Sequence, residues 1–351
     1  MLSIYAGNTA AARLREEGFH QDMFTAFLGA SGGPKWFTLF GLDKYMFGEF
    51  FRSRKKPLQL IGSSAGAFRS ACFAQANPVE AIERLAEHYC HTTYSDKPTP
   101  AEITEKAKAL LDIVVPDDNL DEIIQNPVMK AHFIVAKVNG LVASERKATQ
   151  LLGLTRSYAL NRFKRQAIKS QYERFVFSSP SGQLEFQDDY QFATTTIPFT
   201  PQNLKLSLLA SGSIPLVMQG IPNIPGAPKG MYRDGGIIDY HFDIKINSGD
   251  GLVLYPHFNA SPRAGWFDKS LTRKVSRHNY DNVVMLVPSE EFVASLPYQK
   301  IPDREDFTQF SAEQRIAYWQ QVFKETERLA DDFDTFCQTI GDRPILPIDS
   351  I

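Results

Sequence analysis

The chain has 351 residues, of which 43% are hydrophobic and 22% are charged, which is enough apolar material for one large globular domain or two smaller ones. Its formal charge of −2 gives no reason to expect a nucleic acid as partner. The three cysteines, Cys72, Cys90 and Cys337, lack the CxxC spacing of metal and redox sites and are typical of plain thiols in a reducing compartment.

The sequence does not indicate insertion into a membrane. Residues 1–18 lack the basic start and the continuous apolar core of a cleaved signal peptide. The longest apolar runs are far shorter than the roughly 18 to 20 residues that a spanning helix needs. We therefore expect a soluble, cytoplasmic protein, which leaves peripheral membrane contact and export without a cleaved signal open.

The first 80 residues alternate between predicted strands and helices. A buried strand is expected over 23–30, followed by a helix over 35–51 with apolar residues at helical spacing. A second strand over 57–62 leads directly into a helix that begins at Ala65 and ends before Pro78. Two strand, turn and helix units in succession predict an α/β domain with a mostly parallel sheet flanked by helices.

The rest of the chain continues this pattern. Residues 79–128 are expected to be mostly helical, with a turn at 114–119. A long helix over 311–337 opens with the capping-box pair Ser311 and Gln314. Further strands are expected over 130–140, 230–234, 251–258 and 281–288.

The glycine-rich stretch LGASGGPKWF, residues 28–37, resembles a phosphate-binding loop. A Walker A loop has the pattern G-x-x-x-x-G-K-[ST], and from Gly29 this chain supplies the spacing and Lys35. Pro34 stands at the second glycine position and has no N–H to donate, and Trp36 replaces the hydroxyl that would bind magnesium. Nucleotide binding is therefore disfavoured, although it remains an alternative.

The stretch GSSAG, residues 62–66, matches the pattern G-x-S-x-G. It lies between a predicted strand and a predicted helix, as the nucleophile elbow of serine hydrolases does. Gly62 and Gly66 remove the side chains that would collide at such a turn, and Ser64 would carry its hydroxyl on the exposed bend. We therefore interpret Ser64 as a candidate nucleophile.

A serine hydroxyl needs a neighbouring base to take its proton. His241 and His257 lie downstream, near strand ends where the base of a hydrolase could sit. Asp234 ends a predicted strand and is followed by Gly235 and Gly236, which allow a sharp turn and a close approach. A buried aspartate within hydrogen-bond reach of the serine could itself act as base.

Four stretches occur in an order that resembles the patatin-like phospholipase family, and together they extend over about residues 22–260. They are SGGPKW at 31–36, GSSAG at 62–66, ASGSIPLVM at 210–218 and DGG at 234–236. The resemblance implies a three-layer α/β fold with a mostly parallel sheet. It divides the chain into a catalytic domain over 1–290 and a helical C-terminal extension over 291–351 packed on it.

By position, the resemblance makes Ser64 the nucleophile and Asp234 the base of a Ser–Asp dyad. It places Gly32, Gly33 and Lys35 on the loop that forms the oxyanion hole. Two residues depart from the family pattern, since Ser31 replaces the first glycine of this loop and Trp36 replaces the last. Trp36 brings a large ring to the site and leaves the size of the substrate open.

The resemblance implies a lipid acyl hydrolase, either a phospholipase or an esterase, that cleaves fatty-acyl esters of glycerolipids without a metal or an organic cofactor. A first alternative is a carboxylesterase in which Ser64 uses His241 or His257. A second is a lipid-binding or regulatory protein that keeps the fold but has lost turnover. The head group, the acyl position and the oligomeric state are not indicated.

Residues 130–174 contain ten basic and two acidic side chains, although the whole chain is slightly acidic. Within 145–174, apolar residues recur at roughly helical spacing, which predicts a basic amphipathic helix. Such a helix either packs on the sheet with a solvated basic face or contacts an anionic membrane and orients the active site toward it.

Overall fold

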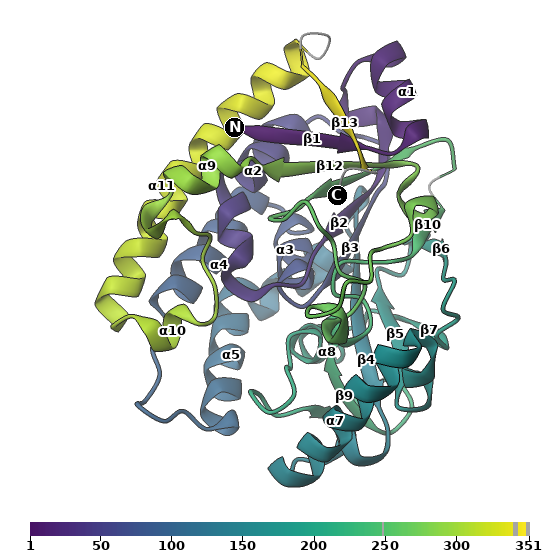
Figure 1. The fold of residues 1–351 in the computed structure, drawn as a ribbon, viewed down its shortest axis with the longest axis vertical. Helices are drawn as coiled ribbons and strands as arrows, with labels where there is room; N and C mark the ends of the chain where they lie inside the picture. Colours follow the sequence, from purple (N-terminus) through teal and green to yellow (C-terminus); the bar gives the residue numbers. More distant parts are fainter. Residues whose placement is uncertain (248, 340–342, 349–351) are drawn as a thin grey trace.

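A computed structural model describes residues 1–247, 249–339 and 343–348. A central mixed sheet is flanked by helices, and a long C-terminal helix lies along one side of the molecule (Figure 1). The strands are β1 Leu2–Ala6, β2 Phe24–Gly29, β3 Leu58–Ser63, β4 Met129–Val138, β5 Tyr172–Ser178, β6 Glu185–Gln187, β7 Thr194–Pro198, β8 Ile221–Pro222, β9 Met231–Asp234, β10 Lys245–Asn247, β11 Leu252–Pro256, β12 Val283–Pro288 and β13 Ile345–Pro347. The α-helices are α1 Asn8–Glu17, α2 Phe40–Tyr45, α3 Ala65–Phe73, α4 Pro78–His91, α5 Pro100–Val114, α6 Leu120–Ile124, α7 Lys147–Phe163, α8 Leu204–Ser211, α9 Glu290–Ser295, α10 Asp306–Gln309 and α11 Ala312–Gln338.

The sheet has the strand order β13, β1, β12, β11, β2, β3, β4, β5, β7, and β9 pairs with both β4 and β8. Its centre, from β12 through β11, β2 and β3 to β4, is parallel, whereas β1, β5 and β9 pair antiparallel with their neighbours β12 and β4. The predicted α/β class with a mostly parallel sheet is confirmed. β6 and β10 form a separate antiparallel pair.

The central strands are apolar on both faces, as parallel strands covered by helices must be. Every residue of β11 and β12 is buried. One face of the sheet contributes to a large core shared with α2, α3, α4 and α11, and the other packs on a second apolar cluster that includes Phe242, Tyr255 and Tyr280. The same arrangement places the carboxyl ends of β2 and β3 side by side, through the pairing of Gly29 with Gly62.

The predicted helix over 35–51 is correct in position but not in type. It consists of a 3₁₀ segment at Gly33–Leu39, the short helix α2 and a π-type turn at Met46–Phe50. Aromatic side chains of this stretch pack against α11, with 5.1 Å between the ring centroids of Phe37 and Trp319. Because the segment is packed between α3 and α11, tertiary contacts prevail over regular α-helical winding.

Other boundaries follow local signals. α3 ends at Phe73, and Pro78 occupies the first turn of α4, where its missing N–H costs nothing. The predicted capping box at the start of α11 is confirmed, since Ser311 and Gln314 exchange hydrogen bonds between side chain and backbone. In the segment predicted as the C-terminal extension, α11 packs on α2 and β13 pairs with β1 at the edge of the sheet.

The predicted helix over 145–174 is too long. α7 ends at Phe163, and from Tyr172 the chain forms β5, whose aromatic and β-branched residues pair antiparallel with β4. Two of the basic residues counted in this segment are not on the surface. Arg165 is buried in an ion pair with Asp268, and Arg174 is buried in ion pairs with Asp188 and Asp239.

Within the described residues, the structure contains no helix that combines the length and the apolar character needed to cross a membrane.

Candidate active site

Ser64 occupies the single residue between the end of β3 and the start of α3. Its backbone has φ 53° and ψ −124°, a strained conformation for a residue with a side chain. The turn is packed so tightly that a Cβ on Gly66 would lie 1.8 Å from the carbonyl oxygen of Gly29. A Cβ on Gly62 would lie 2.3 Å from the carbonyl oxygen of Gly66. Glycine at both positions is therefore a steric requirement of the bend.

The hydroxyl of Ser64 donates a hydrogen bond of 2.9 Å to Oδ2 of Asp234. Asp234 ends β9, and β9 pairs with β4, which is the neighbour of β3. The other carboxylate oxygen, Oδ1, accepts the N–H of Gly236 at 2.7 Å. Gly235 is needed for this approach because a Cβ there would lie 2.0 Å from the carbonyl oxygen of Ile134. The structure thus brings together two residues that are 170 positions apart.

Two serines of the stretch 210–218 support this pair. Ser211 Oγ accepts the N–H of Ser64 at 3.0 Å and donates to the carbonyl oxygen of Ile134 at 2.7 Å. The N–H of Asp234 donates to the carbonyl oxygen of Ser213 at 3.1 Å. Sequence reasoning placed this stretch among the motifs without giving it a task, and the structure shows that it connects the elbow to β4 and β9.

The glycine-rich loop lies beside Ser64. Gly33 has φ +57°, in the left-handed region that favours glycine, and a Cβ on Gly32 would lie 2.7 Å from the ring of Phe258. Among the described residues, no hydrogen bond uses the N–H of Gly32 or of Gly33. Ser31, which departs from the family pattern, hydrogen-bonds the Ser63 hydroxyl at 2.8 Å and so ties the loop to the elbow.

Lys35 and Trp36 do not extend freely into the site. The ammonium of Lys35 pairs with Asp303 at 2.9 Å, so it is engaged by the segment that precedes α10. Trp36 is buried, and its ring lies 4.8 Å from that of Phe37 between centroids. Trp36 therefore forms part of the wall of a cavity instead of blocking the serine.

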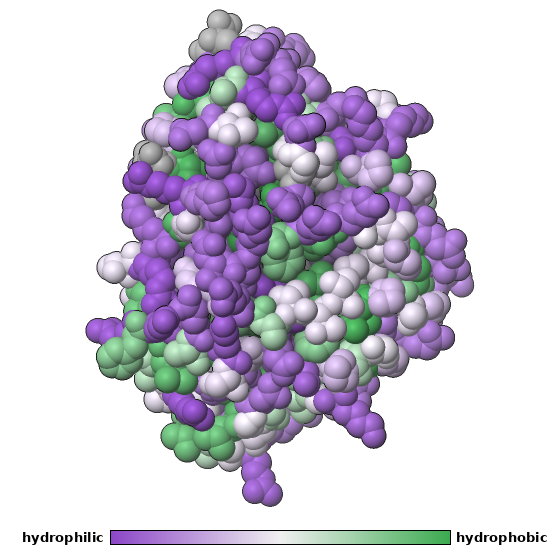
Figure 2. All heavy atoms as spheres, turned by 90° about the vertical axis from the view of Figure 1, so that its right-hand side faces the viewer, coloured by the Kyte–Doolittle hydropathy of each residue, from purple (hydrophilic) through white to green (hydrophobic). Residues whose placement is uncertain are grey.

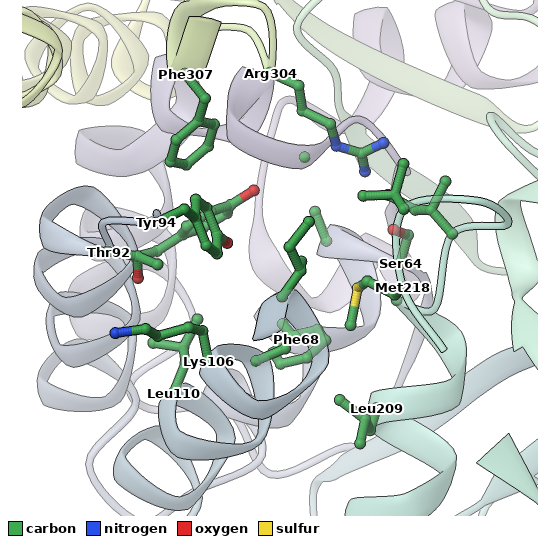
Figure 3. Close-up of a pocket in the computed structure, with 18 of the residues that line it drawn as sticks. Ser64, Phe68, Thr92, Tyr94, Lys106, Leu110, Leu209, Met218, Arg304 and Phe307 are labelled. Carbon is green, nitrogen blue, oxygen red and sulfur yellow. The ribbon is translucent and has the colours of Figure 1, made fainter. Parts of the chain in front are cut away.

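An apolar cavity of about 390 Å³ opens at Ser64 (Figure 3). This volume lies within the range of about 300 to 1,000 Å³ that is usual for small-molecule pockets. The cavity is enclosed by α3, α4, α5, α8 and the segment around α10, and its walls include Phe68, Leu110, Leu209, Met218 and Phe307. Sequence reasoning gave these residues no role because they come from four helices and the loop after α8 and carry only ordinary core patterns.

Two further cations stand near the dyad and were also missed. Arg304 lines the apolar cavity together with Ser64, and both Arg304 and Lys269 line a smaller cavity that contains Ser64 and Asp234. Burial raises the pKa of Asp234, and the positive charges of Arg304 and Lys269 oppose that rise. The surrounding protein and the charge of Arg304 lower the pKa of Lys269 to about 8.

The two histidines considered as bases are buried and neutral. Burial lowers the pKa of His257 to about 3 and the pKa of His241 well below its ordinary value. Nδ1 of His257 accepts the N–H of Asn259 at 2.9 Å, and Nδ1 of His241 accepts the N–H of Arg263 at 2.9 Å. Among the described residues, neither histidine hydrogen-bonds Ser64, whose hydroxyl is directed at Asp234 instead.

In the described part of the chain, no group of three or more His, Cys, Asp or Glu side chains is arranged to hold a metal ion.

No family model matches the chain, and the curated proteins include no match to it. Two solved structures resemble it in fold. Human GIVD cytosolic phospholipase A2 is 11% identical, with 97% of this chain and 65% of that chain aligned and a TM-score of 0.41. VipD from Legionella pneumophila is 13% identical, with 94% and 70% aligned and a TM-score of 0.35. The chain thus spans 65% of the length of the phospholipase.

The environment of Asp234 predicts its titration. Because burial raises its pKa, the carboxyl should titrate above the value of about 3.9 of an ordinary aspartate. Arg304→Gln should raise the pKa further by removing a charge that favours the ionised form. ¹³C NMR of aspartate carboxyls, with Asp234→Asn to identify the resonance, measures both. A midpoint at or below the ordinary value would contradict this description.

Proposed function

We propose that this chain is a lipid acyl hydrolase that cleaves fatty-acyl esters through an acyl-serine intermediate on Ser64. The observation that carries the proposal is the 2.9 Å hydrogen bond from the Ser64 hydroxyl, on a strained elbow, to the buried carboxylate of Asp234. The apolar cavity at the same serine suits an acyl chain better than a polar substrate. The four ordered motifs that resemble the patatin-like family support the same assignment.

Acylation requires two proton transfers, one from Ser64 to Asp234 and one from Asp234 to the leaving oxygen. Ser64 Oγ attacks the ester carbonyl carbon while Asp234 accepts the hydroxyl proton. The carbonyl oxygen becomes an oxyanion, for which the N–H groups of Gly32 and Gly33 are the proposed donors. When the tetrahedral intermediate collapses, the bond to the leaving oxygen breaks, and Asp234 returns the proton to that oxygen. The acyl group remains on Ser64.

Deacylation repeats these steps with water as the nucleophile. Asp234 takes a proton from the water as its oxygen attacks the acyl carbon, and the same N–H groups receive the second oxyanion. Collapse releases the fatty acid, and the proton on Asp234 returns to Ser64 Oγ. Burial keeps the carboxylate basic enough for this exchange because it disfavours the charged form.

The geometry favours the dyad over the alternatives. A Ser–His–Asp carboxylesterase would need His241 or His257 at the serine, whereas both accept backbone N–H groups elsewhere. Nucleotide binding would need a free lysine in the glycine-rich loop, whereas Lys35 pairs with Asp303. A lipid-binding protein without turnover has the same cavity, so activity measurements must distinguish it.

We predict that Ser64→Ala and Asp234→Asn each lower kcat/KM for an acyl ester by at least about 10³-fold. The double variant should lose little more than either single variant because the two residues act as a unit. Hydrolysis of p-nitrophenyl esters and monoacylglycerols measures the effect, and circular dichroism verifies the fold.

His257→Asn is the matched control, because the asparagine oxygen can accept the Asn259 N–H as Nδ1 does. It should keep at least about a tenth of the activity, against a loss of 10²-fold to 10⁴-fold for a true general base. Substantial turnover by folded Ser64→Ala would overturn the assignment. Fluorophosphonate labelling of Ser64 without ester turnover would favour the lipid-binding alternative.

We also propose that the outer face of α7 contacts an anionic membrane. This helix is unusual because it buries polar residues, including Gln150, Ser157 and Asn161, and exposes apolar ones. Phe163 is 88% exposed and Leu152 is 61% exposed. Figure 2 shows the side of the molecule on which α7 lies, with green apolar side chains among hydrophilic ones in its lower half. An exposed apolar face of this kind marks a contact surface.

The charge of α7 favours an anionic lipid surface as the partner. The helix contains no acidic residue, and its exposed side chains include Arg156 and Arg162, with Lys164 directly after it. α7 also lies next to the candidate site, since it packs on Trp266–Asp268, and Trp266 lines the small cavity at Ser64. Docking through α7 would bring this side of the site to the lipid.

We predict that replacing Arg156, Arg162 and Lys164 by Gln weakens binding to vesicles with anionic lipid by at least about tenfold, since each basic residue near such a surface contributes about 1 kcal/mol. Phe163→Ser should also weaken binding to these vesicles. Vesicle sedimentation at low and high salt is the measurement, and Lys55→Gln with Lys56→Gln, at an exposed site elsewhere, is the control. Equal binding by all variants would contradict membrane contact through α7 and leave this helix with a structural role only.

A further inference from the structure

We infer that Arg304 and Lys269 form an anion-binding subsite beside Ser64 that selects acyl esters whose leaving group carries a phosphate or a carboxylate. The inference rests on the proposed function, because it describes the part of the substrate that departs. Both side chains line the small cavity that contains Ser64 and Asp234, whereas the larger cavity at Ser64 has mostly apolar walls.

Neither cation has a carboxylate partner within the described part of the chain. The two nearby carboxylates are already engaged, since Asp234 accepts bonds from Ser64 and Gly236, and Asp303 pairs with Lys35. Asp268, directly before Lys269 in the sequence, is bound by Arg165 and Arg273. Among the described residues that line the small cavity, these two cations face a single carboxylate, Asp234, so the cavity keeps an excess of positive charge that a bound anion would neutralise.

Arg304 is held in place by the glycine-rich loop itself. The ion pair between Lys35 and Asp303 fixes the residue that precedes Arg304. The guanidinium then lies on Gly33, where a Cβ would be 2.7 Å from Nε of Arg304. Figure 3 shows Arg304 reaching from the C-terminal segment toward the side of the cavity that holds Ser64. Arg304 therefore supplies a positive charge at the cavity that Ser64 lines, whereas Lys35 is paired with Asp303.

Lys269 stands at the outer end of the same cavity. The residue as a whole is exposed, but its ammonium lies against the Tyr240 ring, 4.1 Å from the centroid, in a cation–π contact that orients it. The protein around the ammonium lowers its pKa even though the rest of the residue is exposed. The segment before it is rigid because the buried Asp268 also accepts the N–H of Gly265 and a hydrogen bond from Asn161. Arg304 and Lys269 thus place two positive charges at the cavity that Ser64 lines.

The chemistry of the reaction places the leaving group at the small cavity. Asp234 must lie within hydrogen-bond reach of the leaving oxygen to protonate it, and Asp234 lines the small cavity. The acyl chain then takes the apolar cavity. The small cavity has a volume of about 10 Å³, which is room for about one water-sized group, so the leaving oxygen fits inside and the anionic group must lie at the rim, near Lys269.

Phosphate and carboxylate both suit the two cations. An arginine fork binds either group through paired N–H donors, and charge-assisted hydrogen bonds of this type are stronger than neutral ones. Three monoacyl esters with the same acyl chain distinguish a phosphate from a carboxylate as the preferred group: lysophosphatidic acid, an acyl lactate and a neutral monoacylglycerol. The quantity that matters is the ratio of kcat/KM for an anionic ester to kcat/KM for the neutral one.

We expect Arg304→Gln and Lys269→Gln each to lower this ratio by about tenfold or more for at least one of the two anionic esters. Lys106→Gln is the control, since Lys106 lines the apolar cavity at a distance from Ser64 and should leave the ratio unchanged. Loss on the phosphate ester alone would assign a phosphate site, and loss on the lactate alone a carboxylate site. An unchanged ratio for both variants would overturn the inference, as would an equal loss on neutral and anionic esters.

A binding measurement separates this inference from the proposed function. Ser64→Ala protein is titrated calorimetrically with decyl phosphate and with decanol, and the same titrations are repeated with Arg304→Gln added. We expect decyl phosphate to bind at least about tenfold more tightly than decanol, and the added substitution to remove the difference. Equal affinities would overturn the subsite even if Ser64 proves catalytic. Ester hydrolysis that persists in Ser64→Ala would overturn the proposed function and leave this measurement valid.

Discussion

Ser64 holds a backbone conformation that costs of the order of 1 to 3 kcal/mol, and the surrounding chain must supply that energy through packing and hydrogen bonds. Gly29, Gly62 and Gly66 allow β2, β3 and α3 to approach so closely that a methyl group would not fit between them. Ser211 binds the Ser64 N–H and anchors it to β4. Packing among β2, β3 and α3 and the hydrogen bonds of Ser211 thus fix the bend, and the Ser64 hydroxyl donates to the Asp234 carboxylate.

Electrostatics at the dyad is a balance between burial and charge. Burial alone would favour a protonated, inert Asp234, while Arg304, Lys269 and the Gly236 N–H stabilise the carboxylate. The cations come from segments far away in the sequence, and one of them depends on the ion pair between Lys35 and Asp303. The C-terminal segment therefore contributes to the site as well as to the core, so truncating it would alter the charge at Ser64.

The sequence predicted the fold class and the local elements with strong signals, such as the α11 capping box and the strand that ends at Ser63. Glycine spacing made Ser64 and Asp234 candidates because it records the steric demands of a tight bend, and the resemblance to the patatin-like family paired them. The sequence missed Arg304 and Lys269, since a lone cation carries no local pattern and its position depends on tertiary contacts. It extended α7 into β5 because basic and apolar residues continue past Phe163, whereas pairing with β4 decides the conformation from Tyr172 on.

The central claim is that Ser64 becomes acylated with Asp234 as base. Brief mixing with a p-nitrophenyl ester, acid quenching and peptide mass mapping would locate the acyl group directly. We predict an acyl adduct on the peptide that contains Ser64, with its formation in Asp234→Asn slowed by at least about 10³-fold, in line with the expected loss of kcat/KM. An adduct on a histidine or on another serine, or turnover with no adduct on Ser64 and full activity in Asp234→Asn, would contradict the account.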